Sequence, residues 1–234
     1  MDFTSTDVER IRSEGFVREI EVHSEIGSTN DRAAQRAEER ALPCPCLILA
    51  ERQNAGRGRG ANTWWSGSGA LTFSLVLEPR RIGLLTESFP QVALVAGLAV
   101  GEAIERTLPQ SVVGLKWPND VFLDGKKVCG ILLEAPNVES GRLIAGIGVN
   151  VNNSLALAPA ELRRTAVSMI DVAGQPLDRT QIHDELLCTS LEGILNGVAK
   201  SDSPFAQYNP AADFKNCDAF HVTDVNLRAH CNPP

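Results

Sequence analysis

The feature that most constrains the fold is a tight-turn signal, Asp124-Gly125, set between two short apolar runs. Asp-Gly favours the two-residue turn of an antiparallel hairpin, because both of its positions need a positive φ angle. Residues 120–123 precede the turn, residues 127–135 follow it, and another apolar run covers residues 142–151. The sequence therefore predicts neighbouring antiparallel strands in this part of the chain.

Further strands and helices alternate along the rest of the sequence. Residues 31–42 are rich in Ala, Glu and Arg, which are strong helix formers, and Ser28 or Thr29 is suited to cap the start of that helix. Other helices are expected over residues 7–14, 88–108 and 178–200, and other strands over residues 17–25, 47–51, 70–77 and 112–117. This order predicts an α+β fold in which helices cover a mixed or antiparallel sheet.

The composition is that of a soluble globular protein. Of the 234 residues, 43% are hydrophobic and 22% are charged. The longest apolar run, residues 92–100, has nine residues, whereas a membrane-spanning helix needs about 20. The first ten residues lack the basic and apolar segments of a secretory signal, so a cytoplasmic location is expected. The net charge of −7 argues against general binding of nucleic acid.

The six cysteines form no recognisable metal or disulfide pattern. Cys44 and Cys46 form a lone C-x-C pair, the other four are isolated, and no C-x-x-C pair occurs. The four histidines are scattered along the chain as well. We therefore expect free thiols in a reducing compartment and no structural metal.

The densest chemical signal is the segment QNAGRGRGANTWW, residues 53–65. Glycines allow the backbone N–H groups to approach an anion closely, and the guanidinium groups of Arg57 and Arg59 match carboxylate and phosphate. The alternatives are a solvated flexible loop or an RNA-binding Arg-Gly segment, and the short motif and the acidic chain argue against RNA. The segment is not a P-loop, because no G-K-[ST] follows it.

Two more motifs lie on the predicted strands. In K-W-P-N-D, residues 116–120, Pro118 interrupts the ladder of backbone hydrogen bonds, so that Asn119 and Asp120 are free either to face a site or only to form a turn. In K-K-V-C-G, neighbouring side chains point to opposite faces, so one lysine is solvated and Lys127 is the candidate for a site. The alternative for Lys127 is an ordinary solvated lysine.

Taken in order, these motifs resemble those of bacterial biotin protein ligases. The order is S-T-N, Q-x-A-G-R-G-R, W, K-W-P-N-D, K-V-C-G-I-L-L-E and G-I-G-V-N-V-N, over residues 24–152. The resemblance implies the catalytic fold of biotin and lipoate ligases, which is similar to that of class II aminoacyl-tRNA synthetases. It also implies the family's reaction, in which biotin and ATP give biotinyl-5'-adenylate and pyrophosphate. The biotin then passes to one lysine of a carboxylase carrier domain, with no covalent enzyme intermediate.

The resemblance also gives roles to the residues of these motifs. Lys127 and Arg59 are the expected catalytic residues, because cations must stabilise an anionic carboxylate that attacks an anionic α-phosphate. Magnesium brought by ATP would share that task. The urea of biotin has one acceptor and two donors, which hydroxyl and amide groups match. The residues expected to bind biotin are Ser28, Thr29, Asn30, Gln53, Arg57, Gly58, Arg59 and Lys127, and those expected to bind the nucleotide are Trp64, Asn119, Asp120 and Asn150.

The sequence departs from the family pattern in three places. Residues 60–64 lack the third arginine that the family carries. About 23 residues precede the first motif, which leaves no room for the DNA-binding domain of many relatives, so no repressor role is expected. We expect a catalytic domain over residues 1–200 and a shortened remnant of the family's small C-terminal β domain over residues 201–234, with a strand over residues 213–225.

Two alternatives to an active biotin ligase stay open. A catalytically weak protein that binds biotin or biotinyl-adenylate would fit the altered loop and the short C-terminal part. A lipoate ligase of the same superfamily should lack K-W-P-N-D, which is present here. The expected partners are biotin, ATP and the carrier domain, without nucleic acid or membrane, and a free sheet edge would allow a homodimer.

Overall fold

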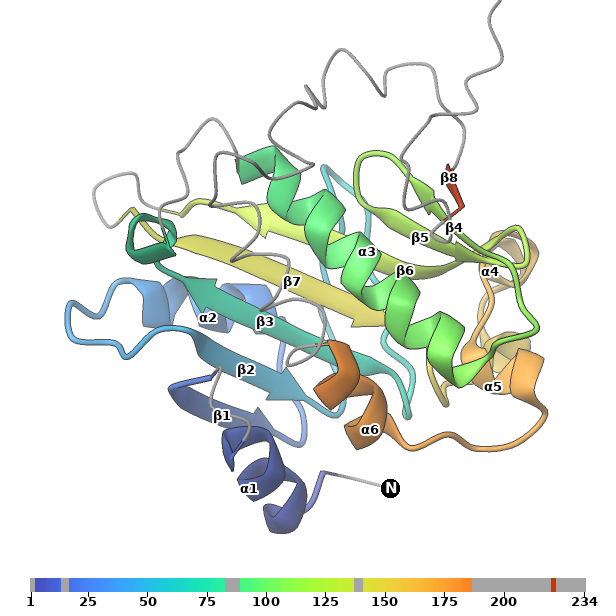
Figure 1. Cartoon of the computed structure of the whole chain (residues 1–234), viewed down its shortest axis with the longest axis horizontal. Helices are drawn as coiled ribbons and strands as arrows, with labels where there is room; N and C mark the ends of the chain where they lie inside the picture. The colour runs from blue at the N-terminus through green and yellow to red at the C-terminus, as the bar shows by residue number, and fades with distance from the viewer. Residues whose placement is uncertain (1–2, 14–16, 83–88, 137–140, 187–219, 222–234) are drawn as a thin grey trace, which may run out of the picture.

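The computed structural model describes residues 3–13, 17–82, 89–136, 141–186 and 220–221 (Figure 1). The strands in these residues form one mixed β-sheet. Its strand order is β1-β2-β3-β7-β6-β5-β4-β8. In this part of the chain β1 and β2 are parallel and all other neighbours are antiparallel. The strands are β1 (Glu19–His23), β2 (Cys46–Ala50), β3 (Leu71–Leu77), β4 (Val113–Lys116), β5 (Asp120–Leu123), β6 (Lys126–Glu134), β7 (Leu143–Val149) and β8 (Phe220–His221).

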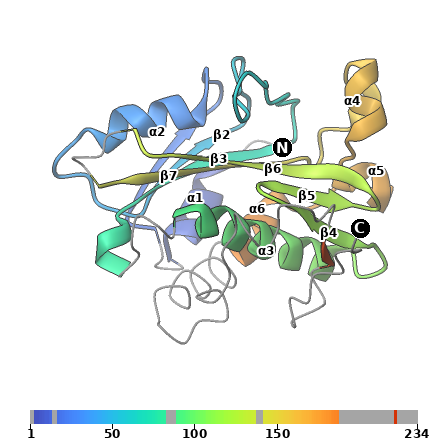
Figure 2. The same cartoon turned by 90° about the horizontal axis from the view of Figure 1, so that it is seen from above.

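Helices lie on both faces of this sheet. Figure 2 shows α2 and the loop that follows β2 on one face, with α3, α1 and α6 on the other. The helices are α1 (Ser5–Ser13), α2 (Thr29–Ala37), α3 (Phe89–Thr107), α4 (Ala160–Thr165), α5 (Met169–Ala173) and α6 (Arg179–Asp184), with short 3₁₀ turns at Pro79–Ile82 and Leu155–Leu157. The predicted α+β class with a mixed sheet covered by helices is confirmed.

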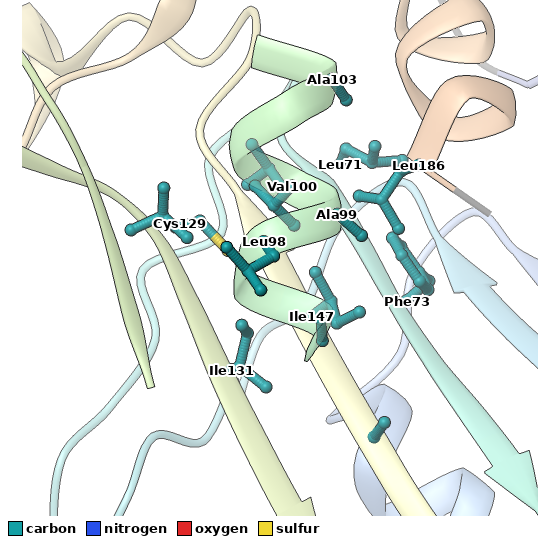
Figure 3. Packing of buried hydrophobic residues seen from close by; sticks show 14 of the residues in the cluster. Leu71, Phe73, Leu98, Ala99, Val100, Ala103, Cys129, Ile131, Ile147 and Leu186 are labelled. Atoms are coloured by element: carbon teal, nitrogen blue, oxygen red, sulfur yellow. The ribbon is translucent and has the colours of Figure 1, made fainter. Parts of the chain in front are cut away.

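The main hydrophobic core fills the space between α3 and the sheet (Figure 3). Because strand residues alternate between faces, Leu71, Phe73, Leu75 and Leu77 of β3 all point to this side. Burial of each such side chain contributes about 1.5–3 kcal/mol. The opposite face has a much smaller cluster under α2. Helices therefore cover one face of the sheet fully and the other only in part.

The predicted Asp-Gly hairpin is present between β5 and β6. Asp124 has a φ angle of 49° and Gly125 one of 79°, as the tight turn requires. The predicted strands in this part of the chain agree with β4, β5, β6 and β7 to within a few residues.

Two predicted helices differ from the observed ones. The helix expected over residues 31–42 is α2, which begins at Thr29 and ends at Ala37. Ser28 occupies the cap position with an extended backbone, but its side chain makes no capping hydrogen bond. The helix expected over residues 178–200 begins as α6, where Asp178 caps Thr180 and Gln181, and its continuation from residue 187 lies outside the described residues.

Three other predictions, on the domain boundary, membrane helices and cysteines, can be compared with the described residues only. The division at residue 200 stays a prediction, because β8, which pairs with β4, is the only described segment beyond it. None of the described helices is long and apolar enough to cross a membrane. Cys44, Cys46 and Cys129 are free thiols, and burial raises the pKa of Cys44 to about 11 and that of Cys46 to about 12.

Arg142, just before β7, holds the C-terminal end of α2. Its side chain is buried, and its Nη1 donates to the carbonyl oxygens of Ala37 at 2.9 Å and Glu39 at 2.6 Å. Its Nη2 lies 3.3 Å from Oε1 of Glu78. One buried cation therefore donates to the last carbonyl of α2 and to a carbonyl of the turn that follows the helix.

We expect Arg142→Met to lower the free energy of unfolding by about 2–3 kcal/mol, because several acceptors lose their donor. The measurement is urea unfolding followed by circular dichroism. Arg80→Met is the control, since Arg80 is exposed and should change stability by less than about 0.5 kcal/mol. Equal stability of the two variants would contradict the role given to Arg142.

Candidate functional site

A cavity of about 490 Å³ opens on the partly covered face of the sheet. Its walls come from the start of α2, the glycine-arginine loop, the β4–β5 turn and strands β6 and β7. Eleven of the twelve residues predicted for the site line this cavity: Ser28, Thr29, Asn30, Gln53, Arg57, Gly58, Arg59, Trp64, Asn119, Asp120 and Lys127.

Glycines of β6 and β7 form the floor of the cavity. A Cβ atom on Gly146 would lie 1.9 Å from Oδ1 of Asn30, and one on Gly148 would lie 2.5 Å from Cε2 of Trp64. Any larger residue at either position would displace these two side chains, which therefore lie directly on the backbone of the sheet. The G-I-G spacing places both glycines on the same face.

Amide and hydroxyl groups form one end of the cavity. Oε1 of Gln53 accepts hydrogen bonds from the backbone N–H of Thr29 at 2.6 Å and from its hydroxyl at 3.1 Å. Gln53 thus supplies the helix cap that Ser28 does not make. Oγ of Ser74 lies 2.8 Å from Oγ1 of Thr29 and 2.6 Å from Oδ1 of Asn30. Sequence reasoning missed Ser74, although alternation along β3 places it opposite the core-facing leucines.

Arg57 is held by carboxylates in this structure. It donates to Glu134 through two bonds, Nη1 to Oε1 at 2.8 Å and Nη2 to Oε2 at 2.6 Å, and its Nη2 also lies 2.8 Å from Oδ1 of Asp31. Glu134 accepts a third bond, at 2.8 Å, from Nδ2 of Asn30. Glu134 was not predicted as a site residue, although it is the final residue of the K-V-C-G-I-L-L-E motif.

The glycine-arginine loop turns tightly beyond Arg57. The N–H of Gly58 donates to the carbonyl of Asn62 at 2.8 Å, and Gly60 has a φ angle of +66° that favours glycine. Arg59 lies in this turn, is exposed and lines the cavity. No carboxylate among the described residues pairs with Arg59, so its guanidinium is available to an anionic ligand.

A β-bulge directs Lys127 into the cavity. Cys129 lies opposite Val121, and Lys127 opposite Phe122, so Val128 is an extra residue in β6. Strict alternation would place Lys127 on the same face as Cys129, which is in the core. The extra residue reverses this relation, as bulges do. Lys127 therefore lies over Gly130, where an added Cβ would be 3.2 Å from its Nζ.

The K-W-P-N-D segment places its polar residues beside Lys127. Oδ1 of Asp120 lies 2.6 Å from Nζ of Lys127, which fixes the direction of the ammonium group. Nδ2 of Asn119 donates to the carbonyl of Ile131 at 2.8 Å, which leaves its amide oxygen for a ligand. Lys116 and Trp117 of the same segment also line the cavity. Pro118 thus does more than form a turn, since both polar residues after it reach the cavity.

The indole ring of Trp64 lies against β6 and β7, over Gly130 and Gly148. Its indole Nε1 is buried and has no hydrogen-bond acceptor among the residues that the structure describes. Buried N–H groups normally have a partner, so this one points to a ligand acceptor or a bridging water.

Asn150 is the predicted site residue that the structure does not bring to the cavity wall. Its Nδ2 donates to the carbonyl of Val167 at 3.2 Å, and its Oδ1 accepts from Asn153 at 2.9 Å. Both functional groups of the side chain therefore hold the turn after β7.

Comparisons with known proteins agree with this geometry. The sequence model of the biotin/lipoate A/B protein ligase family matches residues 23–152. The bifunctional ligase/repressor BirA of Bacillus subtilis is 34% identical over 180 residues, which make up 76% of this chain and 54% of that protein. The biotin–[acetyl-CoA-carboxylase] ligase of Mycobacterium tuberculosis is 33% identical over 172 residues, 73% of this chain and 62% of that one. The chain thus spans about half to three-fifths of the length of these relatives.

A solved structure matches as well. The biotin protein ligase from Aquifex aeolicus, in complex with biotin and ATP, has a TM-score of 0.67 and 32% sequence identity. The match covers 78% of this chain and 72% of that one. With a family match over more than half of its length and a common fold, the chain belongs to the biotin/lipoate A/B protein ligase family.

Proposed function

We propose that this protein is an ATP-dependent biotin ligase. It would form biotinyl-5'-adenylate and pyrophosphate, and then transfer biotin to a lysine of a carboxylase carrier domain. The observation that carries the proposal is one continuous cavity with an amide and hydroxyl end and a cationic end. The Mycobacterium tuberculosis relative is named as a biotin–[acetyl-CoA-carboxylase] ligase, and the Aquifex aeolicus structure was solved with biotin and ATP.

The amide and hydroxyl end suits the urea ring of biotin. The hydroxyl of Ser28 and Nε2 of Gln53 have no hydrogen-bond partner among the described residues, so both are free to donate to the urea carbonyl. The hydroxyl of Thr29 and the amide of Asn30 are already oriented by Gln53 and Ser74. A ring bound here would meet donors and acceptors that need no rearrangement.

The cationic end suits the first chemical step. A carboxylate oxygen of biotin attacks the α-phosphorus of ATP, a P–O bond forms, and the bond to pyrophosphate breaks. Lys127 and Arg59 would stabilise the negative charge on both reactants and on the transition state. Trp64 offers the surface of its ring to the adenine ring.

Magnesium would enter this site together with ATP. It prefers oxygen ligands and commonly binds through one or two carboxylates and the phosphates of the substrate. Asp120 and the amide oxygen of Asn119 offer such oxygens at the cationic end. The ion would supply further neutralisation of the phosphate charge.

The second step requires no nucleophile from this chain. The lysine amine of the carrier domain attacks the acyl carbon of biotinyl-adenylate, and AMP leaves. The enzyme's part is to hold the activated acyl group beside the amine, which removes much of the entropic barrier. The aligned contacts along the cavity are suited to that role.

Two further features belong to this proposal. The free thiols of the half-buried Cys44 and of the buried Cys46 and Cys129 support a reducing compartment such as the cytoplasm. Strand β1 pairs only with β2 in the described sheet, and Val22 on it is 37% exposed. Such an edge is suited to pairing two copies of the chain as a homodimer.

The proposal predicts biotin-dependent exchange of pyrophosphate into ATP. Lys127→Ala should lower this exchange at least ~100-fold, because one preorganised charge is lost. Lys126→Ala is the matched control, since Lys126 is exposed and does not line the cavity. Exchange that depends on lipoate instead of biotin would refute the proposed substrate, and biotin binding without exchange would refute the proposed activity.

The two floor glycines should affect different substrates. Gly146→Ala would displace Asn30 and raise the KM for biotin about tenfold, the effect of losing one or two well-placed hydrogen bonds. Gly148→Ala would displace Trp64 and raise the KM for ATP about tenfold through lost stacking. Steady-state kinetics with each substrate varied in turn would measure both effects. The same change of both KM values in the two variants would contradict the assignment of the two ends.

For Arg59→Ala we expect faster release of the activated intermediate, because an unpaired cation that faces it is removed. The measurement is the dissociation rate of radiolabelled biotinyl-adenylate after gel filtration. Arg40→Ala, a change at an exposed arginine that does not line the cavity, serves as the control. An unchanged dissociation rate in Arg59→Ala would remove this residue from the site.

A further inference from the structure

Glu134 connects two separate walls of the cavity. It is the last residue of β6, and its carboxylate accepts the two-pronged bond from Arg57 of the loop, at 2.8 and 2.6 Å. The same carboxylate accepts a bond from Nδ2 of Asn30, in the first turn of α2, at 2.8 Å. One side chain therefore joins the loop, the helix and the sheet.

Arg57 and Arg59, the two arginines of the glycine-arginine loop, differ in their surroundings. Its guanidinium lies between Glu134 and Asp31, so its charge is balanced by carboxylates of the protein. Two residues further on, Arg59 has no such partner in the described part of the chain. This contrast indicates that Arg57 anchors the loop, while Arg59 is available to the ligand.

The chemistry of a carboxylate also determines how Asn30 is oriented. An ionised carboxylate only accepts hydrogen bonds, so Nδ2 of Asn30 must face Glu134 and Oδ1 must face Ser74. The hydroxyl of Ser74, which also lies 2.8 Å from Oγ1 of Thr29, then directs its one proton to Asn30. Glu134 thus sets the direction of the bonds at Asn30 and at Ser74.

We propose that Glu134 is a positioning residue of the site. It fixes the amide of Asn30 for recognition of the urea ring, and it anchors Arg57 so that the loop presents Arg59 to the cavity. This inference rests on the proposed function for its kinetic consequences, whereas the anchoring of the loop stands apart from any activity.

The carboxylate is ionised in the working range of pH. Burial acts to raise the pKa of Glu134, but the hydrogen bonds from Arg57 and Asn30 outweigh burial and hold the pKa below its ordinary value. The anchor is therefore present at neutral pH, and it weakens only when acid protonates this group.

The test is Glu134→Gln, which keeps the size of the side chain but replaces one acceptor with a donor. We expect the KM for biotin to rise about tenfold or more, because Asn30 loses its fixed direction, and kcat to fall by a smaller factor, because the loosened loop presents Arg59 less well. Glu25→Gln is the matched control, because Glu25 pairs with Arg52 beside the same loop but does not line the cavity. A fall in kcat with an unchanged KM would overturn the positioning role.

A second measurement needs no ligand and no activity. Limited trypsin digestion should cleave after Arg59 at least about tenfold faster in Glu134→Gln than in the wild type or Glu25→Gln, because the loop has lost its anchor. Equal cleavage rates would refute the anchor even if the wild-type protein proved to have another substrate. Absence of biotin-dependent exchange in the wild type, with faster cleavage in the variant, would refute the proposed function alone.

The variant Arg57→Lys tests whether Arg57 anchors the loop or instead acts as a cation that binds the ligand. Lysine keeps the charge but cannot form the two-pronged bond, so this variant should match Glu134→Gln in the rate of trypsin cleavage. It leaves the bond between Asn30 and Glu134 in place, so the KM for biotin should rise less than in Glu134→Gln. The double variant should be cleaved no faster than the faster of the two single variants, because both remove the same anchor of the loop. Additive effects on the cleavage rate would show that Arg57 and Glu134 act separately on the loop, which would contradict the proposal.

Discussion

The alternation of side chains along β3, β6 and β7 is the constraint on which the rest of the structure depends. On one face these strands present large apolar residues such as Phe73 and Ile131, which pack against α3. On the other face they present Ser74, Gly130, Gly146 and Gly148. The same strands thus supply both the apolar core and the floor of small residues on which a ligand can lie. A cavity could not form here if both faces had large residues, because side chains would fill it.

Two local departures from regular secondary structure bring polar side chains to the cavity. The extra residue Val128 moves Lys127 from the core face to the cavity face without breaking the pairing of β6 with β7. The start of α2 is capped by Gln53 from the loop, in place of Ser28, so the first turn of the helix is attached to the cavity wall. In both cases the change places a polar side chain, Lys127 or Gln53, in the wall of the cavity, which couples the fold to the site.

The sequence alone predicted the central hairpin and, through its resemblance to a known family, eleven of the residues that line the cavity. Turn signals such as Asp124-Gly125 and short motifs such as K-W-P-N-D are local, and local patterns can be read without knowing what lies across the sheet. Ser74 and Glu134 were missed because their roles arise from neighbours on other elements, Asn30 and Arg57. The bulge at Val128 could not be foreseen either, since strict alternation is the only rule that the sequence offers for the direction of a strand residue.

At Arg57 and Asn150 the residue type alone does not determine whether the side chain is free to bind a ligand. Composition indicates that an arginine in a glycine-rich loop is suited to anions, but it does not show that two carboxylates of the protein already hold Arg57. An asparagine after a strand can equally face a ligand or hold a turn, and the structure has Asn150 hydrogen-bonded to Val167 and Asn153. Residue type sets what a side chain can bind, whereas its neighbours decide whether those groups remain free.

The arrangement of charge also explains how an acidic chain can take an anionic ligand. Lys127 is paired with Asp120, and Arg57 with Glu134, so these cations are held in fixed directions and do not repel one another. Arg59 and Lys116 line other parts of the wall, without a carboxylate partner among the described residues. In the proposed reaction, attraction of a triphosphate would come from these two unpaired cations. Orientation at the reacting atoms would come from Lys127, whose ammonium is already held in place and need not reorganise as charge develops.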